Sequence, residues 1–365
     1  MVMIAAFLWG CKPRFKIQPQ AYIIGENNIK VMENPKTSGL PNHILNSSAV
    51  LTTSVGENRR KFCSGTIVPP EKEGQNVRIL TNHHCFIEFE EDMSASGELL
   101  PGHCSSTKVY LNFFKNPEHT PVILECKEGT FRSDPGGDLA VFEVKKNPPA
   151  PYTPAKFWTG PDPEEKREAL IIHYPFIDAD DPNKSTNGRI EPTSGIYLPY
   201  AQITEESCET GGFFPRDEWQ FDPALPVSLK HNCDQKKGSS GSALWDKQTA
   251  TVIGVNWGGI ILTYSNQPED STYNVATKVT YVLDFLNQEN STPHPATVSP
   301  PLSSADAVAI EKDSASKQDK PKALCGTLSG GSSDSHWLLV LPMIVLAFWR
   351  RSDVPSKTAM DSEDL

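Results

Sequence analysis

The sequence predicts an all-β protein, and three observations lead to that fold class. The chain contains 31 prolines and 24 glycines in 365 residues, which favours many short strands and turns over long helices. From Ser47 onward, runs of β-branched and aromatic residues such as AVLTTSV, KFCSGTIV and VRILTNHHCF are separated by polar turns. A hydrophobic content of 38% with seven tryptophans is enough to build a packed core. We therefore expect one β-rich unit over residues 47–288.

The chain before this unit divides into two segments. Residues 1–20 begin with the apolar run MVMIAAFLWG, which is similar to the hydrophobic region of a signal peptide, although no positive charges precede it. The run Leu8 to Cys11 is also similar to a lipoprotein cleavage site, so a lipidated Cys11 and a truncated export signal are alternatives. Residues 21–46 are polar with little periodicity, which indicates a propeptide or an N-terminal arm.

Three more segments follow the β-rich unit. Residues 289–336 are rich in Ser, Pro, Ala, Lys and Asp, a composition typical of a disordered linker. Residues 337–351 hold the apolar run WLLVLPMIVLAFW and two arginines. This run of 13 residues is shorter than the roughly 20 that span a bilayer, so a membrane anchor and a cleaved C-terminal sorting tail are alternatives. Residues 352–365 form a polar tail.

Charge and cysteine content exclude some classes of function. A net charge of −11 and a pI near 5.4 exclude a nucleic-acid partner, because phosphates require a basic face. Eight cysteines indicate an oxidising compartment, and we expect a secreted, periplasmic or surface protein. No CxxC pair or closely spaced Cys/His cluster with the spacing of zinc ligands is present, so we expect disulfides and no metal. Six cysteines fall inside the β-rich unit, where 15 pairings are open from the sequence: Cys63, Cys85, Cys104, Cys126, Cys208 and Cys233.

The stretch CDQKKGSSGSALW, residues 233–245, holds the candidate nucleophile Ser240. Glycines on both sides of this serine allow a tight turn whose N–H groups point outward, a geometry that suits an oxyanion hole. A nucleophilic serine needs a base and an orienting carboxylate. His84 ends the apolar run ILTNHH before a cysteine, and Asp138 opens the strand DLAVFEV. A Ser/Gly loop and a turn aspartate without chemistry are the alternatives for the serine and the aspartate.

These three motifs resemble those of the trypsin-like serine proteases, whose residues also occur in the order His, Asp, Ser. Within that group GGDLAVFEV, GSSGSALWD and GVNWGG look most similar to strings of the bacterial glutamyl endopeptidases. The resemblance spans roughly residues 47 to 286. It implies two antiparallel six-stranded β-barrels with the site between them and a C-terminal helix. The helical spacing of apolar residues over 275–287 also predicts this helix. It further implies a Cys63–Cys85 disulfide, and pairing sequence neighbours then gives Cys104–Cys126 and Cys208–Cys233.

The resemblance also assigns roles around the serine. His84 is preferred over His83 as the base because it contacts the cysteine, and the N–H groups of Gly238 and Ser240 are expected to form the oxyanion hole. The backbone of Trp257, Gly258 and Gly259 is expected to pair with an extended substrate.

Specificity is expected to depart from that of the glutamyl endopeptidases. Gln235 and Asn256 stand where those enzymes have a threonine and a histidine that receive an acidic side chain. Asp234 lies six residues before Ser240, the offset of the carboxylate in the trypsin pocket, and predicts cleavage after Arg or Lys. Ser239 stands where trypsins carry the aspartate that binds a new N-terminus, so Ile23-Ile24-Gly25 is expected to have no carboxylate partner.

We therefore expect a monomeric serine endopeptidase that acts on protein or peptide substrates without a cofactor. The alternative is a catalytically inactive binding protein built on the same fold at the cell surface.

Overall fold

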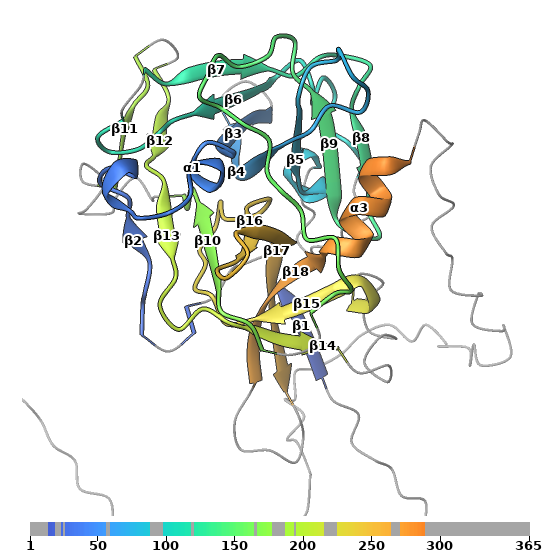
Figure 1. The fold of residues 1–365 in the computed structure, drawn as a ribbon. Helices are drawn as coiled ribbons and strands as arrows, with labels where there is room; N and C mark the ends of the chain where they lie inside the picture. Colours follow the sequence, from blue (N-terminus) through green and yellow to red (C-terminus); the bar gives the residue numbers. More distant parts are fainter. Residues whose placement is uncertain are drawn as a thin grey trace, which may run out of the picture. The chain divides into compact units, whose positions relative to one another are not determined.

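The computed structural model describes residues 14–18, 23–24, 26–55, 59–87, 98–117, 120–163, 166–176, 187–192, 195–214, 225–263 and 271–288. These residues form two large antiparallel sheets, a two-stranded ribbon and a helix near the C-terminal end of the described chain (Figure 1). The linker, the apolar tail and Cys325 lie outside the described residues, as does most of the signal-like segment 1–20, of which only residues 14–18 are described. Within the described part of the chain, no helix is long and apolar enough to cross a membrane.

The first sheet has seven strands, and each strand pairs with its neighbours in antiparallel register. Hydrogen bonds from Lys127 N–H to the Glu143 carbonyl (2.8 Å) and from Lys145 N–H to the Glu125 carbonyl (2.9 Å) connect the strand at one end of the sheet with the strand next to the other end, so the sheet curls toward a barrel. In sheet order the strands are β7 (Val122–Glu125), β6 (Thr107–Leu111), β3 (Ser48–Val55), β4 (Arg59–Val68), β5 (Arg78–Thr81), β9 (Leu139–Glu143) and β8 (Arg132–Asp134).

The second sheet has nine strands. The main path runs β14 (Thr210–Phe213), β15 (Ser228–His231), β18 (Ser271–Lys278), β17 (Thr251–Thr263), β16 (Ala243–Asp246), β10 (Ala169–His173), β13 (Gln202–Thr204) and β2 (Lys30–Val31). A further strand, β1 (Arg14–Gln18), pairs with β17. The two-stranded ribbon is β11 (Gly188–Ile190) with β12 (Tyr197–Pro199), and the 3-10 turn η4 (Leu225–Val227) precedes β15.

Helix α3 (Val279–Asn287) packs against both sheets. Its apolar residues Val282, Phe285 and Leu286 join Leu80 of the first sheet and Val255 of the second in one buried cluster. The helix is shorter than the span 275–287 predicted from the sequence, because residues 271–278 pair with β17 as strand β18. By joining the two sheets, the helix fixes the position of the strands that carry the candidate residues.

The segment predicted as a propeptide or an N-terminal arm contributes to the core. It forms β2, the 3-10 turn η1 (Pro35–Thr37) and the short helix α1 (Asn42–Leu45). Met32, Ile44 and Leu45 are buried in the same cluster as Trp245 of β16. Removing this part would expose apolar surface, so the packing favours an arm that stays with the protein.

The predicted all-β class with a C-terminal helix is confirmed, and so are the three disulfides. Cys63–Cys85, Cys104–Cys126 and Cys208–Cys233 are all bonded, with sulfur–sulfur distances of 1.97, 2.00 and 2.03 Å. The sheets are barrel-like but not closed, and they contain seven and nine described strands where the sequence predicted six in each. The extra strands of the second sheet include β1 and β2, which come from the N-terminal segment.

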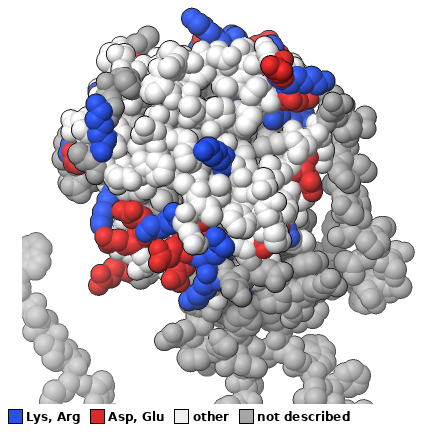
Figure 2. Space-filling view, viewed as in Figure 1, with Lys and Arg blue, Asp and Glu red and all other residues white. Residues whose placement is uncertain are grey.

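Charge is mixed over the face drawn in Figure 2, where basic and acidic side chains lie together and much of the centre is uncharged. A shallow hollow in the surface is lined by four glutamates and one lysine: Glu168, Glu205, Glu206, Glu209 and Lys247.

Candidate active site

His84 and Asp138 form a buried pair at the edge of the first sheet. The distance from His84 Nδ1 to Asp138 Oδ2 is 2.6 Å, and the backbone N–H of His84 donates to Asp138 Oδ1 at 2.9 Å. The two residues are only 7% and 4% exposed. Because both carboxylate oxygens are bound by the same histidine, the imidazole is held in one orientation with Nε2 directed away from the carboxylate.

The local fold at His84 differs from the strand end that we predicted. The strand β5 stops at Thr81, and His83–Phe86 form the 3-10 turn η2. Asn82 precedes the turn and donates from Nδ2 to the backbone carbonyl of Asp138 at 2.8 Å, which holds the turn to the Asp138 segment. In the described part of the chain, both buried ring nitrogens of His83 lack a hydrogen-bond partner, and burial lowers the pKa of this histidine.

Asp138 lies in a tight turn that the second sheet and α3 support. Its φ of 50° is in the left-handed region, which is uncommon for a residue with a side chain. Thr277 of β18 donates from Oγ1 to the Gly137 carbonyl at 2.6 Å. A Cβ at Gly137 would lie 2.3 Å from the Tyr281 ring, and Tyr281 donates to Asp134 Oδ2 at 2.6 Å. The turn therefore needs glycine at 137 and is fixed by contacts on both sides.

Ser240 lies in the loop 236–241, which is bound to the first sheet through Ser64 of β4. The Ser64 N–H donates to the Ser240 carbonyl at 2.7 Å, and Ser64 Oγ donates to the Gly238 carbonyl at 2.8 Å. A Cβ at Gly241 would lie 2.1 Å from Thr81 Oγ1 and 2.2 Å from the Ser64 carbonyl oxygen. The loop is thus in direct contact with the end of β5, three residues before His84.

Some backbone N–H groups of this loop donate to described residues, and others do not. Those of Ser239, Gly241 and Ser242 donate to backbone carbonyls at 3.0, 2.8 and 3.1 Å. The N–H groups of Gly238 and Ser240 donate to no described residue. These two donors are the pair predicted for the oxyanion hole. Ser240 is half-buried, and its hydroxyl also has no hydrogen bond to a described residue.

Ser239, next to the candidate nucleophile, has a different environment. It is fully buried, and its Oγ lies 2.6 Å from Nδ1 of His173 on β10. The Lys236 N–H donates to the same hydroxyl at 3.1 Å. Burial lowers the pKa of His173 to about 3, with Lys236 as a second cause, so this histidine is neutral at physiological pH. His173 therefore carries a hydrogen bond to the loop.

Asp234 has partners that the sequence did not predict. It is 1% exposed, and its Oδ1 and Oδ2 accept hydrogen bonds from the backbone N–H groups of Ile24 and Asn28, both at 2.7 Å. The expectation that the segment at Ile23 has no carboxylate partner is therefore wrong. Ser239 indeed replaces the aspartate found there in trypsins, but the carboxylate of Asp234, two residues before the loop, binds the segment instead.

Gln235 and Asn256 are also buried, at 1% and 0% exposure. Gln235 Nε2 lies 3.0 Å from Nε2 of His231, and Asn256 donates from Nδ2 to Ser242 Oγ at 2.8 Å. Burial lowers the pKa of His231 to about 3, against the opposing effect of hydrogen-bonding groups on Val275 and Asn256. Gln235, Asn256 and His231 therefore form a buried group of neutral side chains near the start of the loop.

The predicted substrate strand, Trp257 to Gly259, is the middle of β17. Trp257 donates from Nε1 to Ser228 Oγ at 3.2 Å and marks a bulge in the pairing of β17 with β18. From Gly259 to Thr263 the strand pairs antiparallel with β1, and Gln18 lies opposite Gly259. Strand β1 of the same chain therefore pairs with β17 from Gly259 onward, and Gly259 is the last residue of the predicted substrate strand.

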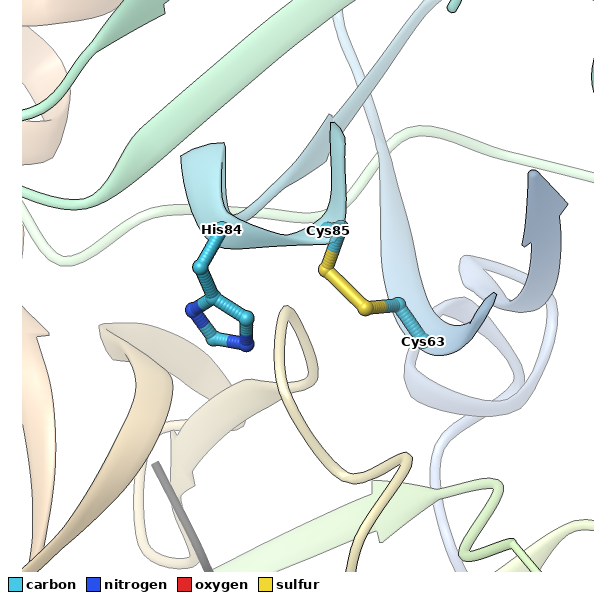
Figure 3. Close-up of side chains that lie close together, drawn as sticks. All are labelled: Cys63, His84 and Cys85. Atoms are coloured by element: carbon cyan, nitrogen blue, oxygen red, sulfur yellow. A yellow bond between two sulfur atoms is a disulfide. The ribbon is translucent and has the colours of Figure 1, made fainter. Parts of the chain in front are cut away.

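The Cys63–Cys85 disulfide lies beside His84 and connects β4 to η2 (Figure 3). The ligand atoms of Cys63, His84 and Cys85 all lie within 4.8 Å of one another, a spacing that would suit a metal ion. The sulfurs are joined in a disulfide, however, and a metal requires thiolates. The arrangement therefore fixes the turn that carries His84.

Comparison with known proteins agrees with this geometry. The family profile described as the trypsin-like peptidase domain matches residues 63–255, which include His84, Asp138 and Ser240. The chain belongs to the trypsin-like peptidases. Among solved structures, a Glu endopeptidase in complex with MPD is 19% identical over 73% of this chain and 100% of its own, with a TM-score of 0.45. The active form of the Rv3671c protease from M. tuberculosis is 15% identical over 74% and 95%, with a TM-score of 0.38. No curated protein matches significantly.

As a trypsin-like peptidase with three disulfides, the protein has the features of an extracellular or periplasmic protease that acts on proteins or peptides. Sequence reasoning missed several residues that support the candidate site of this peptidase. Three of them donate to backbone carbonyls of segments distant in sequence, a role for which no local pattern gives a signal: Ser64, Asn82 and Thr277. The fourth, Tyr281 of α3, donates to the side chain of Asp134.

Proposed function

We propose that this trypsin-like peptidase is a serine endopeptidase that hydrolyses peptide bonds through Ser240, His84 and Asp138. The observation that carries the proposal is the buried His84–Asp138 pair, with its 2.6 Å contact at Nδ1. A carboxylate at Nδ1 selects the tautomer whose Nε2 can accept a proton, which is what a serine nucleophile requires. The family membership supports the same chemistry.

The proposed reaction proceeds through an acyl-enzyme. Ser240 Oγ attacks the carbonyl carbon of the scissile bond while His84 takes its proton, and Asp138 stabilises the imidazolium. The N–H groups of Gly238 and Ser240, which donate to no described residue, bind the oxyanion of the tetrahedral intermediate. His84 then returns the proton to the leaving amine. Water attacks the ester, and the same histidine acts again as base to release the product and free Ser240.

Labelling with a fluorophosphonate, together with hydrolysis of a mixed peptide library, tests this proposal. Ser240→Ala should remove both labelling and hydrolysis, and His84→Ala should lower both nearly as far, because the triad acts as a unit. Asp138→Asn should lower kcat by about 10⁴, since the wrong imidazole tautomer is then favoured. Ser105→Ala and Asp284→Asn change exposed residues of the same types and should behave as wild type. Hydrolysis that survives in Ser240→Ala would reject the triad, and an unlabelled, inactive wild type would favour a binding protein.

The preference for Arg or Lys remains a prediction, and the contacts of Asp234 weigh against it. A pocket carboxylate attracts a cationic side chain because its own charge is otherwise unpaired. Here both oxygens of Asp234 already accept hydrogen bonds from Ile24 and Asn28. Cleavage sites in the same peptide library decide this point. A strong preference for Arg or Lys that disappears in Asp234→Ser would establish the pocket role.

A further inference from the structure

The contact between Asp234 and the N-terminal segment joins residues more than 200 positions apart in the chain. Hydrogen bonds to a carboxylate are stronger than those between neutral groups, and two backbone donors satisfy both of its oxygens. None of the ion pairs between described residues includes Asp234, so these two donors are what compensates its burial in the described structure.

The backbone around Asp234 is fixed from two other directions. The carbonyl of Asp234 accepts a hydrogen bond from Thr204 Oγ1 of β13 at 3.0 Å. The carbonyl of Cys233 accepts one from Asn274 Nδ2 of β18 at 2.8 Å, and Cys233 is bonded to Cys208. The N-terminal segment therefore adds a third contact to Cys233–Asp234, which lie just before the loop that carries Ser240.

The N-terminal segment is itself anchored just beyond the contact. Lys30 and Val31 of β2 pair with Ile203 and Gln202 of β13, and the Met32 N–H donates to the Ala201 carbonyl at 2.9 Å. The segment thus approaches the loop along the same strand whose Thr204 binds Asp234. Its position is determined by the fold and not by a single hydrogen bond.

We propose that Asp234 is the docking residue for the segment Ile24–Asn28 and, through this contact, a positioning residue for the loop that carries Gly238 and Ser240. The proposal rests on the serine endopeptidase function proposed above. It requires that the active enzyme retains Ile24, so any processing of the N-terminus lies before this residue. It also assigns Asp234 a partner within the chain in place of a substrate side chain.

Substitutions of Ile24 and Asp234 in the full chain test the proposal, and they leave the proposed catalytic triad unchanged. Ile24→Pro removes the N–H that Asp234 Oδ1 accepts, and Glu26→Pro is the matched control at an exposed position within the same segment. We expect Ile24→Pro to lower kcat and the rate of fluorophosphonate labelling by about 10-fold, the factor that corresponds to one hydrogen bond to a charged group. Asp234→Ala also loses the bond from Asn28 and should lower both at least as far. KM and the preferred cleavage site should change little, and the double variant should lose no more than Asp234→Ala alone.

Asp234→Asn keeps an acceptor oxygen and serves if Asp234→Ala does not fold. It should retain more activity than Asp234→Ala, and its loss should again be shared with Ile24→Pro. Ile24→Pro that behaves like Glu26→Pro would overturn the proposal. So would an Asp234 variant whose main change is the preferred cleavage site. A wild-type chain that is not labelled at all would instead overturn the serine endopeptidase function.

Discussion

Ser64 Oγ donates a hydrogen bond to the carbonyl of Gly238 at 2.8 Å and thereby ties the loop of the candidate nucleophile to the opposite sheet. The same hydroxyl accepts the Tyr174 N–H at 2.9 Å, and the Ser64 N–H binds the Ser240 carbonyl at 2.7 Å. Ser64 is fully buried and contacts the loop at two points. Its third contact is with Tyr174, the first residue after β10.

Ser64→Ala should lower kcat more than it raises KM. The variant loses the bond to Gly238 and leaves the buried Tyr174 N–H without its acceptor, a cost of about 1–3 kcal/mol. The loop then becomes free to reorient the N–H groups of Gly238 and Ser240. Steady-state hydrolysis of one peptide checks this, with Ser105→Ala as the control because its hydroxyl bonds only within an exposed turn. Unchanged kcat in Ser64→Ala would contradict a positioning role.

Gly241→Ala should abolish activity and destabilise the fold. Its φ of 86° is left-handed, and an added Cβ would lie 2.1 Å from Thr81 Oγ1. Gly129 is a matched control, since its φ of 78° carries the same backbone strain but a Cβ there would meet nothing within 4 Å. Gly129→Ala should therefore cost only about 1 kcal/mol, the strain of the left-handed conformation. Thermal unfolding of both variants separates backbone strain from steric clash, and equal losses would contradict the close contact.

Ser239→Ala should reduce stability. Its hydroxyl is the described partner of His173 Nδ1, and His173 Nε2 is also buried without a partner in the described structure. Removing it leaves a buried imidazole unsatisfied at a cost of about 1–3 kcal/mol. Urea unfolding should show this loss, while kcat measured well below the unfolding transition should stay close to that of wild type. A large fall in kcat at unchanged stability would point to a direct catalytic role of Ser239.

Acid should destabilise the protein through two buried histidines. The pKa of His173 and of His231 is about 3 in the folded protein, below the ordinary value of 6.5. Below pH 6.5 the unfolded chain therefore binds protons that the folded chain does not, and each histidine lowers the free energy of unfolding by about 1.4 kcal/mol per pH unit down to about pH 3.

The difference between wild type and a His231→Gln variant isolates this effect from the titration of carboxylates. Unfolding free energies at pH 7, 6, 5 and 4 should fall more steeply for wild type, by about 1.4 kcal/mol per pH unit. Identical slopes for the two proteins would show that His231 does not stay neutral in the folded state.

The sequence by itself determined the fold class and the family, because these follow from local patterns. Turn-separated β-branched runs predict strands, and the motifs around His84, Asp138 and Ser240 are contiguous strings that can be read without knowing the fold. The resemblance they carry also named Cys63–Cys85 as a disulfide, which the structure contains.

Only the tertiary structure decided what surrounds those motifs. Ser64, Thr81 and Thr277 act through backbone carbonyls of segments more than 100 residues away or on another strand, and a hydrogen bond to a carbonyl leaves no pattern in the sequence. The role of Asp234 was open for the same reason. Its offset from Ser240 is that of a pocket carboxylate, but whether a buried carboxylate faces a substrate or a distant N–H depends on which segment the fold brings to it. Here the fold brings Ile24 and Asn28.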